Sequence, residues 1–462
     1  MRLIYNSIIL LLFINIQAFS QNIQSPSEFL GYEIGTQFSR HSQVIDYFDY
    51  VSNELPDNMK MEKYGETYER RPLYLAYISS KENIKNIDLI RKNNLSNAGI
   101  IKKEINSSIN KDIAIVWLSY NVHGNESSST EASMKTLYLL LTKNSNLLDN
   151  TIVIIDPCVN PDGRDRYANW YNQTVTIPYN TNSKSREHDE PWPGGRANHY
   201  LYDLNRDWAW ITQTESKSRL KIYNKWLPHV HVDYHEQGID NPYYFAPAVE
   251  PYHEIISKWQ RDFQKEIGKN NAKYFDKNGW LYFTKETFDL LYPSYGDTYP
   301  TYLGAIGMTY EKAGGGVAGL GILNSENKVL TLVDRVNHHT TTGISTVEIS
   351  SINAKKLNDE FKLFFNNRSK TNNYILKGNS NKIQTLKKLL DAHEITYSYG
   401  KQHKTLAYSY QSNKNENIQT MSATTTTITT TKNTANGNNQ NSIGTNQSNS
   451  ITNNTNLSML PS

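Results

Sequence analysis

Cysteine is almost absent from this chain of 462 residues, which contains only Cys158. A single cysteine cannot form an intramolecular disulfide, so the fold has to be held together by its hydrophobic core. Cys158 comes soon after the apolar residues 152–155, and this setting favours a buried structural thiol over a nucleophile. We therefore expect no thiol chemistry.

An excess of charge of one sign is also missing, since 48 Lys and Arg residues face 45 Asp and Glu residues, which gives a net charge of +3. The chain has no dense basic block, so nucleic acid is not an expected partner. Hydrophobic residues make up 37% of the sequence, and the mean hydropathy is −0.65. Because this apolar shortfall is concentrated near the C-terminus, the remainder can still bury a sizeable core. We expect a monomer.

Long apolar runs are scarce, and the one at the N-terminus, residues 8–14, is too short to span a bilayer. Arg2 precedes it, and Ala18 and Ser20 supply small residues at the two positions that a signal peptidase reads. These features predict a signal peptide over residues 1–20. We therefore expect a secreted or periplasmic protein with no transmembrane segment after cleavage.

The most informative stretch begins with the apolar run at residues 112–120, which is typical of a strand buried on both faces of a parallel sheet. His123 and Glu126 follow it. Ser128 and Glu131 then have the spacing of a capping box at the start of a helix. Open α/β sheets bind their ligands in such turns. An imidazole and a carboxylate at this spacing can share one zinc ion, although the pair alone often occurs by chance.

Further along, residues 151–155 form a second predicted buried strand, which completes a βαβ unit. It leads into residues 160–163, Asn-Pro-Asp-Gly, which indicate a turn. Residues 164–198 are polar and aromatic, and we expect a long functional loop there. Strands are also predicted at residues 230–234 and 306–310, each followed directly by a chemically active residue, His235 and Glu311.

The composition divides the chain into four parts. Residues 1–20 are the predicted signal peptide, and residues 21–350 form a predicted α/β catalytic domain. Residues 351–411 contain a small accessory α/β unit, which could be incomplete. From residue 412 to 462 the sequence consists largely of Thr, Asn and Ser. Such a composition cannot bury enough apolar surface to order itself, so we expect a disordered tail.

Taken singly, each candidate residue has an ordinary explanation. Asp203 could cap a helix, and His235 could be a hydrogen-bonded structural histidine. Glu311 could be a solvated carboxylate. Tyr292 and Tyr295 could be packing residues, since the chain contains 32 tyrosines. Only the combination points to a common site.

In this order along an α/β pattern, the His-x-x-Glu, Asn-Pro-Asp-Gly and Asp-x-Asn-Arg motifs and the strand-end His and Glu resemble the zinc carboxypeptidase family. The pancreatic carboxypeptidases are its familiar members. The resemblance covers roughly residues 25–347 and implies a mixed, largely parallel twisted sheet flanked by helices. It also implies that His123, Glu126 and His235 bind one zinc ion and leave a fourth position open for water. Asp203 matches the acid that orients the first of these histidines.

The resemblance further implies how a substrate is bound and cleaved. Asn205 and Arg206 match the pair that grips the terminal carboxylate of a peptide, a task that suits a planar guanidinium. Glu311 matches the residue that acts as general base and then as general acid. Arg196 is the best match for the arginine that holds the oxyanion, with Arg164 and Arg166 as alternatives.

Tyr292 matches the mobile tyrosine that closes over the substrate, and Tyr295 is the reserve. The position that sets side-chain preference falls near Gly296, which leaves the preferred terminal residue open. The implied function is that of a secreted zinc metallocarboxypeptidase acting on peptides or proteins with a free C-terminus. Two alternatives remain: a zinc amidohydrolase for N-acyl amino acids or cell-wall peptides, and a non-catalytic secreted binding protein of the same fold.

Overall fold

The computed structural model describes residues 23–102, 112–366, 373–377, 379–399, 403–420 and 425–429. The predicted signal peptide lies outside the described residues. The helices are α2 (Pro26–Leu30), α3 (His41–Glu54), α4 (Lys81–Lys85), α5 (Ile87–Asn97), α6 (Ser128–Thr142), α7 (Pro161–Thr174), α8 (Thr214–Trp226), α9 (Lys258–Asn278), α10 (Thr298–Tyr302), α11 (Leu332–Ile352), α12 (Ala354–Asn366) and α13 (Ser380–Ala392), with short 3-10 turns η1 (Ser145–Asp149), η2 (Arg186–His188) and η3 (Leu204–Arg206).

The strands are β1 (Met59–Glu66), β2 (Pro72–Ile78), β3 (Ala114–Tyr120), β4 (Thr151–Asp156), β5 (Val230–Gln237), β6 (Tyr243–Tyr244), β7 (Val249–Tyr252), β8 (Tyr282–Phe283), β9 (Asp289–Leu290), β10 (Ile306–Ala313), β11 (Gly321–Leu323), β12 (Val329–Thr331), β13 (Asn373–Lys377), β14 (Ser398–Tyr399), β15 (His403–Ser409), β16 (Lys414–Thr420) and β17 (Thr425–Thr429).

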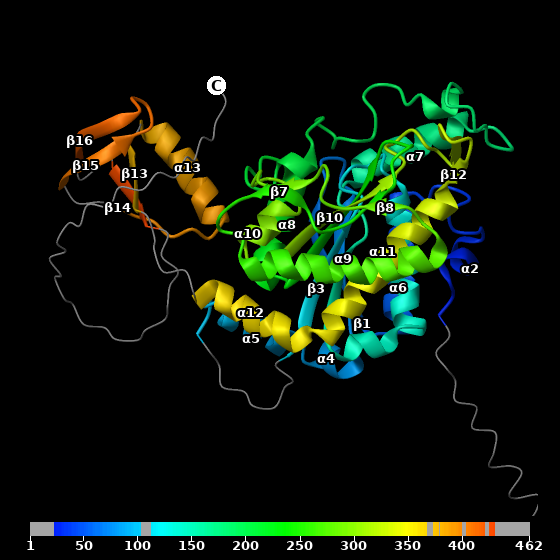
Figure 1. The fold of residues 1–462 in the computed structure, drawn as a ribbon, viewed down its shortest axis with the longest axis horizontal. Coiled ribbons are helices and arrows are strands. Elements are labelled where there is room, and N and C mark those ends of the chain that lie inside the picture. The colour runs from blue at the N-terminus through cyan, green and yellow to red at the C-terminus, as the bar shows by residue number, and fades with distance from the viewer. Residues whose placement is uncertain are drawn as a thin grey trace, which may run out of the picture.

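An eight-stranded sheet with the order β1-β2-β4-β3-β5-β10-β6-β8 forms the centre of the molecule (Figure 1). Its four middle strands, β4, β3, β5 and β10, are all parallel. β1 and β2 are antiparallel to their neighbours, and β6 runs antiparallel to β10. The prediction of a mixed, largely parallel sheet is therefore confirmed. The parallel strands deliver their carboxyl ends to one edge, where such sheets bind ligands.

Both faces of the sheet are covered by helices, as the pattern of buried residues shows. In β3, Val116 packs into the core formed with α3, α6, α9 and α11, whereas its neighbour Trp117 packs into the core formed with α5, α8 and α12. Successive side chains of a strand point to opposite faces, so an uninterrupted apolar run is what a strand between two helical layers requires. Figure 1 shows these helices on either side of the sheet.

Helix α7 corrects the expectation of a long loop over residues 164–198, because the first turns of that stretch are helical. The Asn160 side chain accepts a hydrogen bond from the backbone N–H of Gly163, and Pro161 occupies the start of the helix. These are the N-cap and first-turn preferences of an α-helix. The Asn-Pro-Asp-Gly motif therefore starts a helix as well as turning the chain.

The C-terminal unit lies beside the catalytic domain and includes α13 (Figure 1). His393 at the end of α13 connects the two parts: its Nδ1 lies 2.6 Å from the Tyr299 hydroxyl, and its Nε2 lies 2.8 Å from the Ala209 carbonyl. Two segments after residue 412, where the sequence predicts a disordered tail, form the strands β16 and β17. β17 is a run of β-branched residues that pairs with β13, far upstream in the chain, and composition alone does not show such a pairing.

No helix in the described ranges is long and apolar enough to cross a membrane.

Candidate metal and active site

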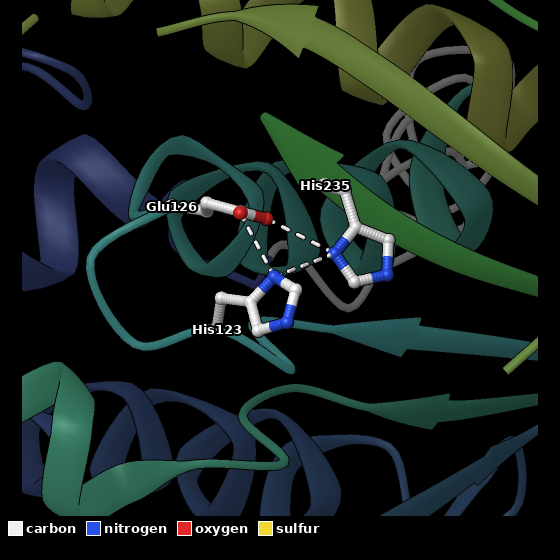
Figure 2. A group of neighbouring side chains, drawn as sticks. All are labelled: His123, Glu126 and His235. Carbon is white, nitrogen blue, oxygen red and sulfur yellow. Dashed lines mark hydrogen bonds and ion pairs between the residues drawn. The ribbon is translucent and has the colours of Figure 1, made fainter. Parts of the chain in front are cut away.

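Three side chains meet near the carboxyl ends of the central strands, and Figure 2 shows them pointing toward one another. His123 Nδ1 lies 2.8 Å from Glu126 Oε1, and His235 Nδ1 lies 3.0 Å from Glu126 Oε2. The two Nδ1 atoms are 3.2 Å apart. All three side chains are buried. The predicted ligand set is thus brought together from two separate segments of the chain.

The donor set fits a zinc ion in both chemistry and size. Two imidazole nitrogens and a carboxylate are the ligands of a catalytic zinc site, and bonds of about 2.0–2.1 Å at tetrahedral angles require donor atoms about 3.3 Å apart. The observed separations of 2.8 to 3.2 Å are close to this value. Within the described part of the chain, these three residues are the only cluster of metal-binding groups.

The turn that carries His123 and Glu126 is shaped by Asn121 and Gly124. Asn121 has a φ of 58°, and its side-chain amide donates to the carbonyls of His123 at 2.9 Å and Glu126 at 3.2 Å. A Cβ on Gly124 would lie 2.2 Å from the carbonyl carbon of Gly163. Only glycine permits this close approach, which anchors the turn against the start of α7.

Glu311 lies beside the metal ligands because of strand register. It pairs with His235 across the parallel strands β10 and β5, and residues in register point to the same face. Burial raises the pKa of Glu311 to about 8. The charge of Glu126 adds to this effect, whereas the charges of His235 and Arg196 oppose it. The carboxyl group is therefore held next to the metal position, with a pKa in the range suited to proton transfer.

The pKa values of the metal ligands Glu126 and His235 are set by their contacts with neighbouring charged groups. Burial alone would raise the pKa of Glu126, but the two imidazoles outweigh burial and hold this pKa well below its usual range. Burial alone would lower the pKa of His235, but its contacts with Asp233 and Glu126 raise it well above the usual value. The cluster therefore keeps Glu126 as the anion that a cation requires.

Of the three candidate arginines, only Arg196 lies at the metal site. Its Nη1 lies 2.9 Å from Glu126 Oε1, and its Nη2 lies 3.1 Å from Asp203 Oδ2. Its side chain is 48% exposed, so the guanidinium is accessible to a substrate. Arg166 donates to the carbonyl of Gly194 instead, at 2.7 Å.

Arg164 is a buried residue of the core and does not reach the metal site. It is fully buried and pairs with Glu131 at 2.5 Å, and it donates to the backbone carbonyls of Ser39 and Ser127. The capping box predicted from Ser128 and Glu131 is therefore wrong, because the Glu131 carboxylate binds Arg164 and Ser39 instead of the helix start. Local spacing could not reveal this long-range ion pair.

Asp203 and Asn205 each contact one of the ligand histidines. Asp203 Oδ1 lies 2.9 Å from His123 Nε2, the nitrogen that does not face the metal position. Burial would raise the pKa of Asp203, but His123 and Arg196 hold it well below its usual range. Asn205 Nδ2 lies 3.3 Å from His235 Nε2. Asp203 therefore contacts the histidine that the sequence predicts it to orient. Asn205 is predicted to bind the substrate carboxylate, and in the structure it contacts the ligand His235.

Arg206 is exposed, and its guanidinium stacks on the Tyr295 ring at 4.4 Å. Its Nη1 donates to the backbone carbonyl of Asn205 at 3.1 Å, but no carboxylate among the described residues forms an ion pair with it. Tyr292 packs edge-on against Tyr295 at 4.9 Å and accepts a hydrogen bond from Trp210 Nε1 at 3.0 Å. Both tyrosines are near Arg206, but neither hydrogen-bonds to the metal ligands.

A mixed α/β sheet with a His-Glu-His donor set at the carboxyl edge of its parallel strands defines a single-zinc metalloenzyme. The model of the family described as zinc carboxypeptidase matches residues 44–267, a segment that contains all three metal ligands. The chain belongs to the zinc carboxypeptidase family and is a zinc-dependent metallocarboxypeptidase.

Solved structures are similar at low identity. A metallo-carboxypeptidase from Burkholderia cenocepacia is 15% identical, with a TM-score of 0.46 over 69% of this chain and 70% of that chain. Carboxypeptidase A from Helicoverpa armigera is 15% identical, with a TM-score of 0.45 over 78% of this chain and 81% of that chain. Thrombin activatable fibrinolysis inhibitor is 16% identical, with a TM-score of 0.47 over 73% of this chain and 79% of that chain. No curated protein sequence matches.

Proposed function

We propose that this enzyme removes single residues from the free C-termini of peptides. The observation that carries the proposal is the position of Arg206, an exposed guanidinium without a carboxylate partner among the described residues. It follows directly after Asn205, which contacts the zinc ligand His235. A guanidinium binds a carboxylate through two parallel hydrogen bonds. A terminal carboxylate held there lies at a fixed distance from the metal, which restricts cleavage to the last peptide bond.

The residues around the metal have distinct roles in the proposed reaction. His123, Glu126 and His235 would hold the zinc ion, which would supply the Lewis acidity to polarise the scissile carbonyl and to acidify a water molecule. Glu311 takes a proton from the attacking water and delivers it to the leaving amine. Arg196 donates hydrogen bonds to the oxyanion that develops on the carbonyl oxygen.

Other residues hold the participants in place. Asp203 accepts a hydrogen bond from His123 and so fixes the orientation of that ring. Tyr292 is the proposed mobile tyrosine that closes over the bound substrate, with Tyr295 as the alternative. The hydrogen bond from Trp210 to the Tyr292 hydroxyl would then have to break on closure.

The test uses the purified enzyme with three kinds of substrate, followed by mass spectrometry. Peptides with a free C-terminus should lose one residue, whereas the same peptides with a C-terminal amide should remain intact. N-acyl amino acids test the amidohydrolase alternative. A chelator should stop the reaction, and one equivalent of zinc should restore it. Cleavage of amidated peptides, or of N-acyl amino acids only, would contradict the proposal.

We further propose that residues 1–20 direct export of the enzyme and are then removed. The support is the sequence pattern alone: a positive charge, a short apolar run and small residues before Gln21. Expression in a bacterium followed by N-terminal sequencing should give a chain that begins at Gln21 outside the cytoplasm. An intact N-terminus on cytoplasmic enzyme would disprove export.

A further inference from the structure

When Nδ1 of the ligand His235 binds a metal, its Nε2–H is left without an acceptor at hydrogen-bond distance among the described residues. A neutral imidazole carries one N–H, and the nitrogen that binds a metal carries none. Nδ1 of His235 faces Glu126 and His123, so zinc at this position requires the proton of His235 to lie on Nε2. The residue is 1% exposed, and its N–H therefore needs an acceptor within the protein.

Asn205 cannot supply that acceptor. Its Nδ2 is the atom that faces His235 Nε2, at 3.3 Å, and an amide nitrogen only donates. Its Oδ1 accepts the backbone N–H of Gly296 at 2.8 Å. Turning the amide would place its NH₂ group against that N–H. Asn205 therefore suits the other tautomer of His235, in which Nε2 is the acceptor.

Asp233 has the acceptor that is needed. Its Oδ1 lies 2.8 Å from His231 Nε2, whereas its Oδ2 lies 3.9 Å from His235 Nε2 and has no hydrogen-bond partner among the described residues. The residue is 0% exposed. A buried carboxylate oxygen without a hydrogen-bond donor lowers the stability of the fold, so a hydrogen bond from a nearby N–H to this atom would be favourable. His231, Asp233 and His235 alternate along β5 and so share one face of the sheet.

Gly296 provides an independent geometric observation. A Cβ at this position would lie 1.5 Å from Asp233 Oδ2, so the carboxylate occupies the space that a side chain would need. Every other residue at position 296 would displace the carboxylate from its place next to His235. The absence of a side chain at Gly296, near which the family resemblance places the position that sets side-chain preference, therefore leaves room for the Asp233 carboxylate.

We propose that Asp233 is a positioning residue for the zinc ligand His235. Its Oδ2 accepts the Nε2–H of the zinc-binding tautomer, as Asp203 Oδ1 does for His123. Closing the contact from 3.9 Å to hydrogen-bond length requires a movement of about 1 Å. Such a contact fixes the tautomer and strengthens the imidazole as a ligand. This inference goes beyond the proposed peptidase activity and depends only on the zinc site.

The first test is the zinc dissociation constant, measured by competition with a chromophoric chelator. Asp233→Asn keeps the shape of the side chain but cannot accept from both histidines, and it should weaken zinc binding about 10- to 100-fold. Gly296→Ala keeps the carboxylate but displaces it, so it should weaken zinc binding as well. Asp156→Asn is the matched control, because Asp156 is a buried carboxylate on β4 that accepts from Tyr64 and contacts no ligand. Its zinc affinity should be unchanged.

The second test is the ¹⁵N and ¹H NMR spectrum of histidine-labelled, zinc-loaded wild-type enzyme, which needs no variant to fold. The Nε2–H of His235 should give a slowly exchanging, downfield proton signal, and this signal should shift in Asp233→Asn. Absence of the signal from the wild-type enzyme would overturn the proposal. Unchanged zinc affinity in Asp233→Asn, with loss of activity only on peptides of one C-terminal residue type, would also overturn it and assign Asp233 to substrate recognition.

Discussion

Glu311 and His235 occupy paired positions on the adjacent parallel strands β10 and β5, so a carboxyl group and a metal ligand share one face of the sheet. Two segments far apart in the sequence acquire this relationship through register alone. A slip of one residue in either strand would turn one of the two side chains to the opposite face. The pairing of these strands therefore sets the distance between the proposed proton carrier and the metal.

Replacing Glu311 by Gln should separate catalysis from metal binding. The amide cannot take a proton from water, so kcat should fall by about 10²- to 10⁴-fold, the usual contribution of a general base. The variant should still contain one equivalent of zinc, because Glu311 is not among the three donors. Peptide hydrolysis and metal analysis on the same sample give both quantities. Activity near that of the wild type would remove Glu311 from the mechanism.

The pKa of Glu311 also predicts how stability depends on pH in chelator-treated enzyme. Burial raises this pKa to about 8, above the ordinary value of 4.5, so the protonated form is favoured in the folded state. Its contribution to stability is complete below about pH 4.5 and is lost as pH rises through about 8. The Gln side chain of the Glu311→Gln variant does not ionise, so the variant avoids this loss. Above pH 8 its melting temperature should therefore exceed that of the wild type by several degrees.

Thermal unfolding of both proteins from pH 5 to pH 9, with chelator present throughout, provides the comparison. The two melting temperatures should diverge as pH increases. Parallel curves would show that Glu311 ionises in the folded state as easily as in the unfolded chain. Zinc should reduce the divergence, because a nearby cation favours the carboxylate.

Arg196 and Arg164 should respond to substitution in opposite ways. Arg196→Ala should lower kcat by about 10²- to 10³-fold, as loss of an oxyanion donor does, with little change in melting temperature since the side chain is 48% exposed. Arg164→Ala leaves the buried Glu131 carboxylate without its partner and should destabilise the fold by about 3–5 kcal/mol. Urea unfolding and steady-state kinetics on both variants test this. A stable but inactive Arg164→Ala would reverse the assignment.

Arg206→Ala should act mainly through substrate binding. Loss of a charge-assisted hydrogen-bond partner costs about 3 kcal/mol, or roughly 100-fold in kcat/KM. Arg206→Lys keeps the charge but not the planar fork, so it should recover only part of this loss. The effect should be confined to peptides with a free C-terminus. Equal kinetics of the alanine variant and the wild type would exclude Arg206 as the carboxylate site.

Much of the fold followed from local patterns, because burial on two faces imposes its own signature on a strand. The apolar runs that became β3 and β4 were identified as central parallel strands, and the turn with His123 and Glu126 was placed at their carboxyl edge. The tail boundary could not be predicted in the same way. The β17 segment is recognisable as a strand through its pairing with β13 and β14.

The sequence by itself determined the chemical inventory: two histidines and a glutamate in the order of a zinc site, with Glu311 at the end of a further strand. Tertiary structure alone decided which arginine reaches the metal, since close contacts between glycine backbones at positions 124, 163 and 195 place Arg196 there, while Arg164 turns inward. It also decided that Asp233 fills the space left by Gly296. Motifs record residue types along one chain, whereas approach between distant backbones depends on how the whole core packs.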